Sequence, residues 1–147
     1  MTDPRRTCCT LAVLLAVLSP SALTVSAQRA PDPKPSVSLR ATPPMGFTPL
    51  RVRVVAELRN GSDDYQEFYC PTVEWEWGDG TTSEYSSDCD PYEAGKSTIE
   101  RRYTAEHVYR QQGQHRIFFR LKQKDDTVAA TSANVQVRGS AGDVFGR

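Results

Sequence analysis

The sequence predicts an all-β protein whose strands form two sheets packed face to face. Three observations lead to this fold class. Apolar and polar residues alternate with a period of two in several short segments, turn residues separate these segments, and no segment keeps amphipathic helical spacing over three turns. About seven short strands, each with one apolar face, need a second sheet to bury that face. The prediction is therefore a β-sandwich.

The N-terminal residues have the pattern of a secretory signal peptide. Arg5 and Arg6 precede the apolar run Leu11–Leu18, and the small residues of Val25-Ser26-Ala27 follow. This order of charged, apolar and small residues is typical of a cleaved signal. We expect residues 1–27 to be the signal peptide, and the mature chain to be secreted or periplasmic.

The composition excludes two classes of partner. The chain has 147 residues with 18 Lys and Arg and 18 Asp and Glu, and removal of residues 1–27 leaves 16 basic and 17 acidic side chains. A nearly neutral chain lacks the broad positive field that sequence-independent nucleic-acid binding requires. The N-terminal apolar stretch is shorter than the roughly 20 residues of a membrane-spanning helix. We therefore expect no nucleic acid as partner, and no membrane span after signal cleavage.

Two cysteines remain after the predicted cleavage, Cys70 and Cys89, because Cys8 and Cys9 lie in the signal peptide. Thiols pair in exported proteins, so we predict a Cys70–Cys89 disulfide. It would close a loop of about 20 residues, for which the chain-entropy model gives roughly 3 kcal/mol. Two free thiols or a metal pair are the alternatives, and the lack of a Cys-x-x-Cys spacing disfavours metal.

The mature chain divides into three parts. Residues 28–35 carry three prolines at alternate positions, which resist helix and sheet and favour an extended, solvated leader. The strand pattern begins near residue 36 and predicts a sandwich domain over residues 36–138. Residues 139–147 include three glycines and are expected to form a flexible tail.

Five segments of the domain alternate clearly enough to predict strands. In the longest, Leu50 to Leu58, apolar residues on one face alternate mainly with charged residues on the other. The other four are residues 37–41, 73–77, 117–121 and 133–137. Two weaker strands are predicted at Thr82–Tyr85 and Ile99–Tyr103, the second weakened by Arg101, which breaks the alternation.

Turn residues separate these segments and support an immunoglobulin-like arrangement. The turn signals are Pro43-Pro44 with Gly46, Asn60-Gly61, Gly78-Asp79-Gly80, Gly95, Gly113 and Asp125-Asp126. Phe118 is the bulky apolar residue that the alternation places outward, where it would cover an edge or form a contact surface. The prediction is an immunoglobulin-like β-sandwich of about seven strands in two sheets.

A longer motif connects the chain to a known family. Trp75-Glu76-Trp77-Gly78-Asp79-Gly80 is followed by His107-Val108-Tyr109 and by Gly113. In this order the residues resemble the signature of the polycystic kidney disease (PKD) domain family, over about residues 36–138. The resemblance implies a PKD-type sandwich that mediates protein-protein or protein-carbohydrate contacts. His115 departs from it, because the family usually has an aromatic residue there.

The motif residues have structural roles that chemistry explains. Trp75 and Trp77 share the inner face of their strand and can anchor both sheets. The two glycines beside Asp79 can adopt positive φ, and the carboxylate can accept hydrogen bonds within its own turn. The resemblance implies that His107 and Tyr109 make structural hydrogen bonds.

Other roles for these residues need partners that no motif supplies. A catalytic Asp79 would need a nucleophile or base, and a metal site of His107 and His115 would need a carboxylate. We therefore expect no catalytic residue, no metal and no cofactor. The chain also lacks the Gly-x-Ser-x-Gly and His-Glu-x-x-His motifs of hydrolases.

The candidate binding residues lie in or beside two long loops, residues 60–72 and 86–98, which the predicted disulfide joins. Loops on a rigid sandwich often carry function, and tyrosine gives a large contact area at a small entropic cost. The candidates are Tyr65, Phe68, Tyr69, Tyr85 and Tyr92. The alternative is that these aromatic side chains cover the disulfide and one another.

The same loops allow two further hypotheses. Their acidic residues could gather the oxygen ligands of calcium, although the spacing matches no known calcium loop; these are Asp63, Asp64, Asp88, Asp90 and Glu93. Asn60-Gly61-Ser62 satisfies the glycan acceptor rule, while Asn-Gly is equally a turn pair.

The expected function is that of a secreted, non-catalytic module that binds an unknown protein or carbohydrate partner. The alternative is a structural or spacer module of a surface or secreted assembly, without a ligand of its own.

Overall fold

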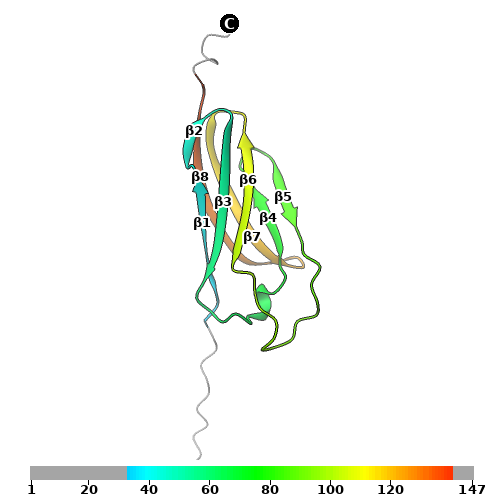
Figure 1. The fold of residues 1–147 in the computed structure, drawn as a ribbon. Coiled ribbons are helices and arrows are strands. Elements are labelled where there is room, and N and C mark those ends of the chain that lie inside the picture. The colour runs from blue at the N-terminus through cyan, green and yellow to red at the C-terminus, as the bar shows by residue number, and fades with distance from the viewer. Residues whose placement is uncertain (1–32, 141–147) are drawn as a thin grey trace, which may run out of the picture. The chain divides into compact units, whose positions relative to one another are not determined.

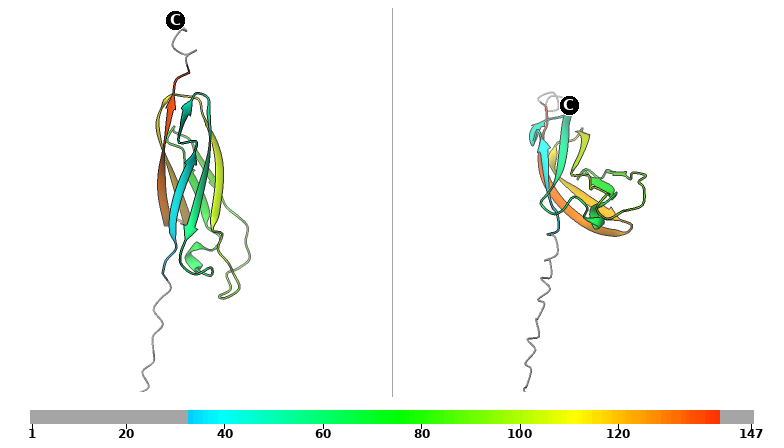
Figure 2. Two further views of the ribbon diagram at one scale, coloured as in Figure 1. Left: turned by 60° about the vertical axis from the view of Figure 1, so that its left-hand side comes forward. Right: turned by 60° about the horizontal axis from the view of Figure 1, so that its bottom comes forward.

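The structure is a computed structural model that describes residues 33–140. Eight strands in this part of the chain form two sheets that pack face to face (Figures 1 and 2). One sheet has the order β1-β3-β6 and the other the order β2-β8-β7-β4-β5. The bounds are β1 Ser36–Thr42, β2 Met45–Phe47, β3 Leu50–Arg59, β4 Thr72–Glu76, β5 Thr82–Tyr85, β6 Arg102–Tyr109, β7 Gly113–Gln123 and β8 Asp126–Arg138, with a short 3₁₀ helix at Gln66–Phe68. The predicted immunoglobulin-like fold class is confirmed.

The core lies between the two sheets and is built by the alternation read from the sequence. Along β3, Val52, Val54 and Ala56 are fully buried, while Arg51 and Arg53, on the other face, are exposed. The facing sheet contributes Trp75 of β4, Trp77 just after it, and apolar residues of β7 and β8. Because one face of every long strand is apolar, the sandwich buries a single continuous core.

Strand β6 differs from its sequence prediction. The alternation predicts a strand at Ile99–Tyr103, but β6 begins at Arg102 and runs to Tyr109. Ile99 is buried in the preceding loop, where its N–H donates to the carbonyl of Asp63 at 2.7 Å. The Arg101 guanidinium donates to two carbonyls of the 60–61 turn. The ladder with β3 runs from Arg102 to Tyr109, and one further backbone bond, from the Leu58 N–H to the Arg101 carbonyl, ends it, while Ile99 and the Arg101 side chain bond to the other loop.

Strand β2 was not predicted, because three residues are too few to show alternation. It pairs in parallel with β8, with Gly46 opposite Val137. Strands β7 and β8 are also longer than predicted, and they pair with each other along nearly their whole length. Apolar and polar residues do not alternate regularly at the ends of these strands, but the ladder continues through them.

The last residue of the predicted leader packs against the sandwich. Pro35 belongs to the segment expected to be solvated, but it is buried and lies against Gly61. A Cβ at Gly61, whose φ is +67°, would lie 2.6 Å from the Pro35 ring, so the turn and the leader are fitted together. The predicted signal peptide and most of the predicted tail lie outside the described residues. Within residues 33–140, no helix is long and apolar enough to cross a membrane.

Candidate functional site

The Gly78-Asp79-Gly80 turn at the end of β4 has the chemistry that the sequence predicts. Gly78 has a φ of +76°, and a Cβ there would lie 2.5 Å from the Arg116 carbonyl oxygen, so only glycine fits without movement. The Asp79 carboxylate accepts hydrogen bonds from the Thr81 N–H at 3.1 Å and from the Thr81 hydroxyl at 2.6 Å. Asp79 therefore closes its own turn.

Aromatic rings stack behind this turn, and their polar atoms have partners. The His107 ring lies on Trp77 with centroids 4.5 Å apart, and its Nε2 is 2.7 Å from Asp79 Oδ2. The Tyr109 hydroxyl donates to the Trp77 carbonyl at 2.8 Å. His115 packs on Tyr109, and its Nδ1 is 3.2 Å from the Gly78 carbonyl oxygen. We call this set of five residues (Trp77, Asp79, His107, Tyr109 and His115) the motif end of the sandwich.

The ionisation of the motif end follows from these contacts. Burial raises the pKa of Asp79, but the hydrogen bonds from Thr81 and His107 outweigh it and leave the pKa below its usual value. Burial, and then the Asp79 charge, raise the pKa of the Tyr109 hydroxyl. Asp79 is therefore held as a carboxylate and Tyr109 as a neutral donor.

No nucleophile is paired with a base at the motif end. The Thr81 hydroxyl donates to Asp79 and not to His107, and Nε2 of His107 faces the same carboxylate. Within residues 33–140, no group of three or more His, Cys, Asp or Glu side chains is placed to hold a metal ion. The contacts of His107 and Tyr109 are the structural hydrogen bonds that the PKD resemblance implies.

The two long loops are tied together at the opposite end of the sandwich. A disulfide joins Cys70 and Cys89, as predicted. The Tyr69 hydroxyl donates to the Asp90 carbonyl at 3.0 Å, and the Tyr92 hydroxyl donates to the Asp64 carbonyl at 2.6 Å. The two tyrosine rings also contact each other edge to face, with centroids 5.6 Å apart. Both side chains therefore cross-link the loops.

Two other aromatic candidates of the loops belong to the packing. Phe68 was a candidate for binding, but its side chain is completely buried in the core and cannot reach a partner. Tyr65 packs edge to face on Phe68, with centroids 5.6 Å apart. The short 3₁₀ helix turns Phe68 inward, and the alternation of apolar and polar residues cannot predict this orientation.

Several acidic side chains of the loops are already paired. Asp63 bonds with Arg101, Glu67 with Lys34 and Glu93 with Lys96. Such exposed pairs contribute little stability, but they use the carboxylates that a cation would need. Asp88 and Asp90 lie on the exposed segment after β5. Asn60 is exposed in the turn with a φ of +60°, and its glycosylation stays a prediction.

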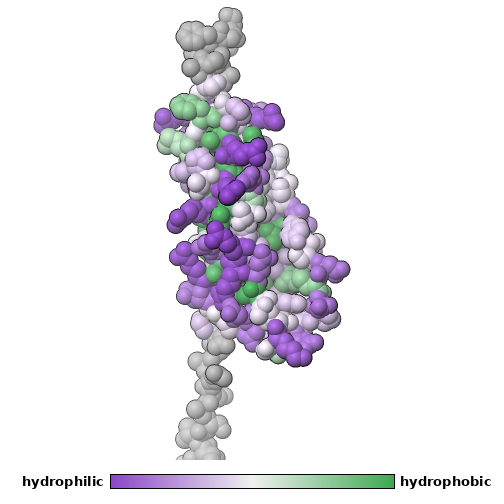
Figure 3. All heavy atoms as spheres, in the orientation of Figure 1, coloured by the Kyte–Doolittle hydropathy of each residue, from purple (hydrophilic) through white to green (hydrophobic). Residues whose placement is uncertain are grey.

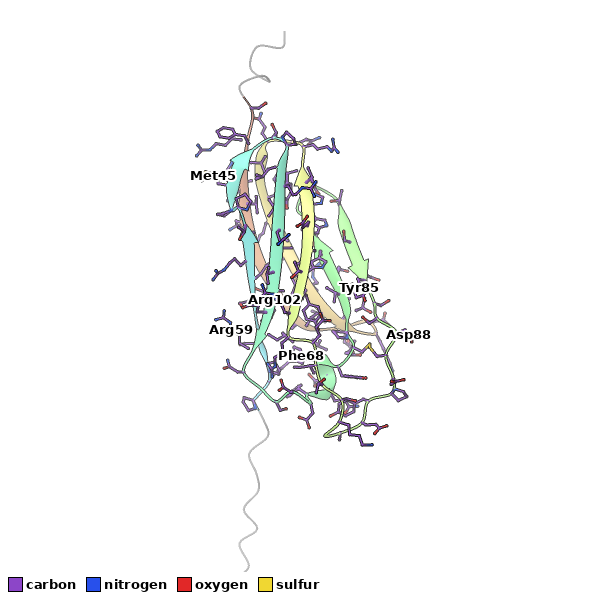
Figure 4. The ribbon with its side chains drawn as sticks, in the orientation of Figure 1. Met45, Arg59, Phe68, Tyr85, Asp88 and Arg102 are labelled. Carbon is purple, nitrogen blue, oxygen red and sulfur yellow. A yellow bond between two sulfur atoms is a disulfide. The ribbon has the colours of Figure 1, made fainter. Side chains whose placement is uncertain are left out.

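Tyr85, the last candidate, lies in a different environment. It ends β5 opposite Val73 of β4, so its side chain belongs to the inner face of the sheet, yet it is 61% exposed. It borders a hollow of about 260 Å³ between β5 and β6. The lining comprises Val73, Trp75, Ser83, Glu84, Tyr85, Glu100, Tyr103, Thr104 and Ala105. We call this hollow the open-side groove; Figure 4 labels Tyr85 at its β5 edge.

The groove contains a buried polar atom without a partner. Tyr103 of β6 is 6% exposed, and among the described residues its hydroxyl has no hydrogen-bond partner. Burial, and then the charge of Glu100, raise the pKa of this hydroxyl, so it is a neutral donor. A buried hydroxyl without a partner costs about 1 to 3 kcal/mol. The groove is therefore lined by aromatic side chains, one of which carries a buried hydroxyl without a partner.

The outer face of the three-stranded sheet is a second surface with distinct chemistry. Figure 3 shows strongly hydrophilic side chains over the lower part of β1, β3 and β6. The charged residues of the whole outer face are Arg40, Arg51, Arg53, Glu57, Arg59, Arg102 and Glu106. Glu57 pairs with Arg59 and Arg102, and Glu106 with the other two arginines of β3. The face is an exposed ion-pair network.

Phe118, expected to face outward, lies on the outer face of the five-stranded sheet. The guanidinium groups of Arg116 and Arg120 lie 4.9 and 5.3 Å from its ring centroid. Arg120 also bonds with Glu74 and Glu76 of β4. The two arginines thus cover Phe118, which is only partly exposed.

The sequence identifies only part of the groove. Trp75 was predicted as a core anchor, and it forms the floor, 5% exposed and packed on Phe119 with centroids 4.6 Å apart. Tyr103 was placed in a weak strand and assigned no role. Its position at an unpaired strand edge depends on sheet order, which alternation does not encode.

The chain is similar to several solved structures. No family model and no curated protein matches the chain. A PKD domain of an M14-like peptidase from Thermoplasmatales archaeon SCGC AB-540-F20 is 14% identical, with a TM-score of 0.48, over 72% of this chain and 97% of that one. A CARDB domain from Pyrococcus furiosus, in complex with di-metal ions, is 14% identical, with a TM-score of 0.48, over 76% and 95%. A solution structure of the same CARDB domain is 12% identical, with a TM-score of 0.42, over 74% and 97%.

Proposed function

We propose that the chain is an exported, non-catalytic binding module that holds a protein or carbohydrate partner in the open-side groove. The observation that carries the proposal is the groove itself, where Trp75, Tyr85 and Tyr103 present aromatic surface beside a buried hydroxyl without a partner. Aromatic side chains dominate binding sites because they bury a large area with little loss of side-chain entropy.

Two further observations support the non-catalytic and exported parts of the proposal. The Asp79–His107 pair is the one arrangement at the motif end that resembles catalytic machinery, and the neighbouring hydroxyl of Thr81 is turned away from the imidazole. The Cys70–Cys89 disulfide fits an oxidising compartment.

The test is a binding screen with variants matched at one position. The chain, expressed with export so that the disulfide forms, is screened on a glycan array and on extracellular proteins of its native source. We expect a ligand whose binding is lost in Tyr85→Ala and kept in Tyr85→Phe, because the Tyr85 hydroxyl already accepts a hydrogen bond from the Ser87 hydroxyl at 3.0 Å and the ring supplies the contact area. A Tyr92→Phe variant, altered in the loops, should bind normally.

The outcomes separate the candidate functions. Binding that survives Tyr85→Ala but is lost when Tyr92 is changed would place the site in the loops and contradict the groove. Absence of any ligand, with all variants folded, would favour the spacer module.

A further inference from the structure

The two sheets are unequal, and the inequality leaves one strand uncovered. The three-stranded sheet ends at β6, while the facing sheet continues past β4 to β5. Ser83 and Tyr85 of β5 lie on the same face as Trp75, toward the interior, yet the described part of the chain has no fourth strand beside β6 to cover them. The open-side groove is therefore the position of one missing strand.

The free edge of β6 can be assigned residue by residue. The Leu58 N–H donates to the Arg101 carbonyl at 2.9 Å, which marks Leu58 and Arg101 as a hydrogen-bonded pair in the antiparallel register with β3. Backbone groups alternate in such a ladder, so those of Tyr103 and Ala105 point toward β3. The N–H and C=O groups of Arg102, Thr104, Glu106 and Val108 point away from β3, along the groove.

The chain that follows β5 does not fill this position. Residues 86–101 leave β5, pass to the loop end of the sandwich and return to β6 (Figure 1). The disulfide of Cys89, the Tyr69 hydroxyl on the Asp90 carbonyl and the Ile99 N–H on the Asp63 carbonyl hold the segment there. These anchors keep it from forming the fourth strand.

The charges around the groove indicate the chemistry of its occupant. Glu100, just before β6, lines it. Among residues 33–140, Glu100 forms no ion pair, whereas the Glu84 carboxylate lies on the opposite face of β5, 3.9 Å from Lys122. A basic side chain on the occupant would have the Glu100 carboxylate within reach, while apolar side chains would face Trp75 and Tyr85.

We propose that an extended segment of a partner protein, with alternating apolar residues and a basic residue at one end, adds to β6 as a fourth strand. Its backbone pairs with Thr104 and Glu106, and its alternate side chains enter the open-side groove. This inference rests on the proposed function and names the class of ligand that the groove would take.

Two other occupants fit the same features less well. A glycan could stack on the aromatic floor, but it would leave the row of β6 backbone groups unused. A second copy joined through β6 would bring its own five-stranded sheet into the space that β5 already occupies, because β5 projects over the position beside β6. One strand fits, and a second sandwich does not.

The test uses a defined peptide and backbone methylation. The probe is an acetylated and amidated heptapeptide of alternating Val and Thr with Lys at one end, added to the ¹⁵N-labelled full chain. Two analogues carry N-methyl groups on one or the other set of alternate amides, which leaves every side chain in place. We expect amide shifts at Thr104 and Glu106, and a loss of affinity of about tenfold or more in only one analogue, because only one set of amides faces β6.

Variants of the chain complete the test. Thr104→Pro removes the edge N–H without removing a bond to β3, and it should abolish peptide binding, while Thr104→Val should bind normally. If Thr104→Pro fails to fold, Glu100→Gln should weaken binding of the Lys peptide several-fold and leave binding of a peptide with Gln in that place unchanged.

The results distinguish this inference from the proposed function. Equal binding of both methylated analogues, or shifts confined to another surface, would overturn strand addition. A glycan that binds with dependence on Tyr85, while the peptide does not bind, would overturn strand addition and leave the proposed function standing. Failure of every ligand would contradict both.

Discussion

The motif end and the open-side groove contain the same kinds of side chain, but the two regions differ in how completely the polar atoms are hydrogen-bonded. At the motif end, the hydroxyl of Tyr109 donates to the Trp77 carbonyl, and the Trp77 ring N–H donates to Ser83 at 2.9 Å. In the groove, Tyr103 is almost as deeply buried, but its hydroxyl has no partner among the described residues, and Tyr85 stands exposed. The comparison shows that hydrogen-bond satisfaction, more than residue type, separates packing from a candidate site.

The largest expected effect tests the motif end as a structural centre. Trp77 is 1% exposed and stacks on Trp75 and His107. We expect Trp77→Ala to lower the free energy of unfolding by about 3 to 5 kcal/mol through the lost contacts and the cavity. Tyr85→Ala, in the groove, should change it by less than about 1 kcal/mol. Urea unfolding measures both changes. Equal losses of unfolding free energy would show that the motif end is no more important for stability than the groove.

The next effect concerns the disulfide, which borders the loop end of the groove through its neighbours Tyr85 and Tyr103. Replacement of Cys70 and Cys89 by serine should lower the free energy of unfolding by roughly 3 kcal/mol, because the unfolded chain gains freedom. Hydrogen exchange should accelerate in residues 86–101 more than in β3. A uniform acceleration in both would show that the disulfide does not act on the segment beside the groove.

Which of these features the sequence predicts depends on how local they are. The Gly-Asp-Gly turn, the inward tryptophans and the disulfide were predicted, because turn chemistry, alternation and cysteine count act over short or pairwise distances. The inward turn of Phe68 and the start of β6 at Arg102 depend on contacts with distant loops. The groove follows from sheet order, so no local pattern could predict it.

The buried hydroxyls of Tyr109 and Tyr103 can each be removed by one substitution. Tyr109→Phe removes a buried hydroxyl that has a partner and leaves the Trp77 carbonyl without it, so we expect a loss of about 1 to 3 kcal/mol. Tyr103→Phe removes a buried hydroxyl that has none, so we expect no loss, or a gain of up to about 1 kcal/mol. Thermal and urea unfolding give the sign of each change. A loss of stability in Tyr103→Phe would mean that its hydroxyl is satisfied in solution.

The smallest effect is the contribution of Asp79, at the motif end, to the pH dependence of stability. Burial raises the pKa of Asp79, but hydrogen bonds from Thr81 and His107 bring it below the usual value in the folded chain. A carboxyl whose pKa is depressed by folding adds stability above its unfolded pKa of about 4, and this stability is lost as the pH falls through the folded value. Asp79→Asn should therefore remove part of the fall in unfolding free energy below about pH 4, relative to the unmodified chain. Glu84→Gln, at the rim of the groove, is the control and should leave that slope unchanged. Equal slopes for Asp79→Asn and the unmodified chain would show that the carboxylate is not held by its turn.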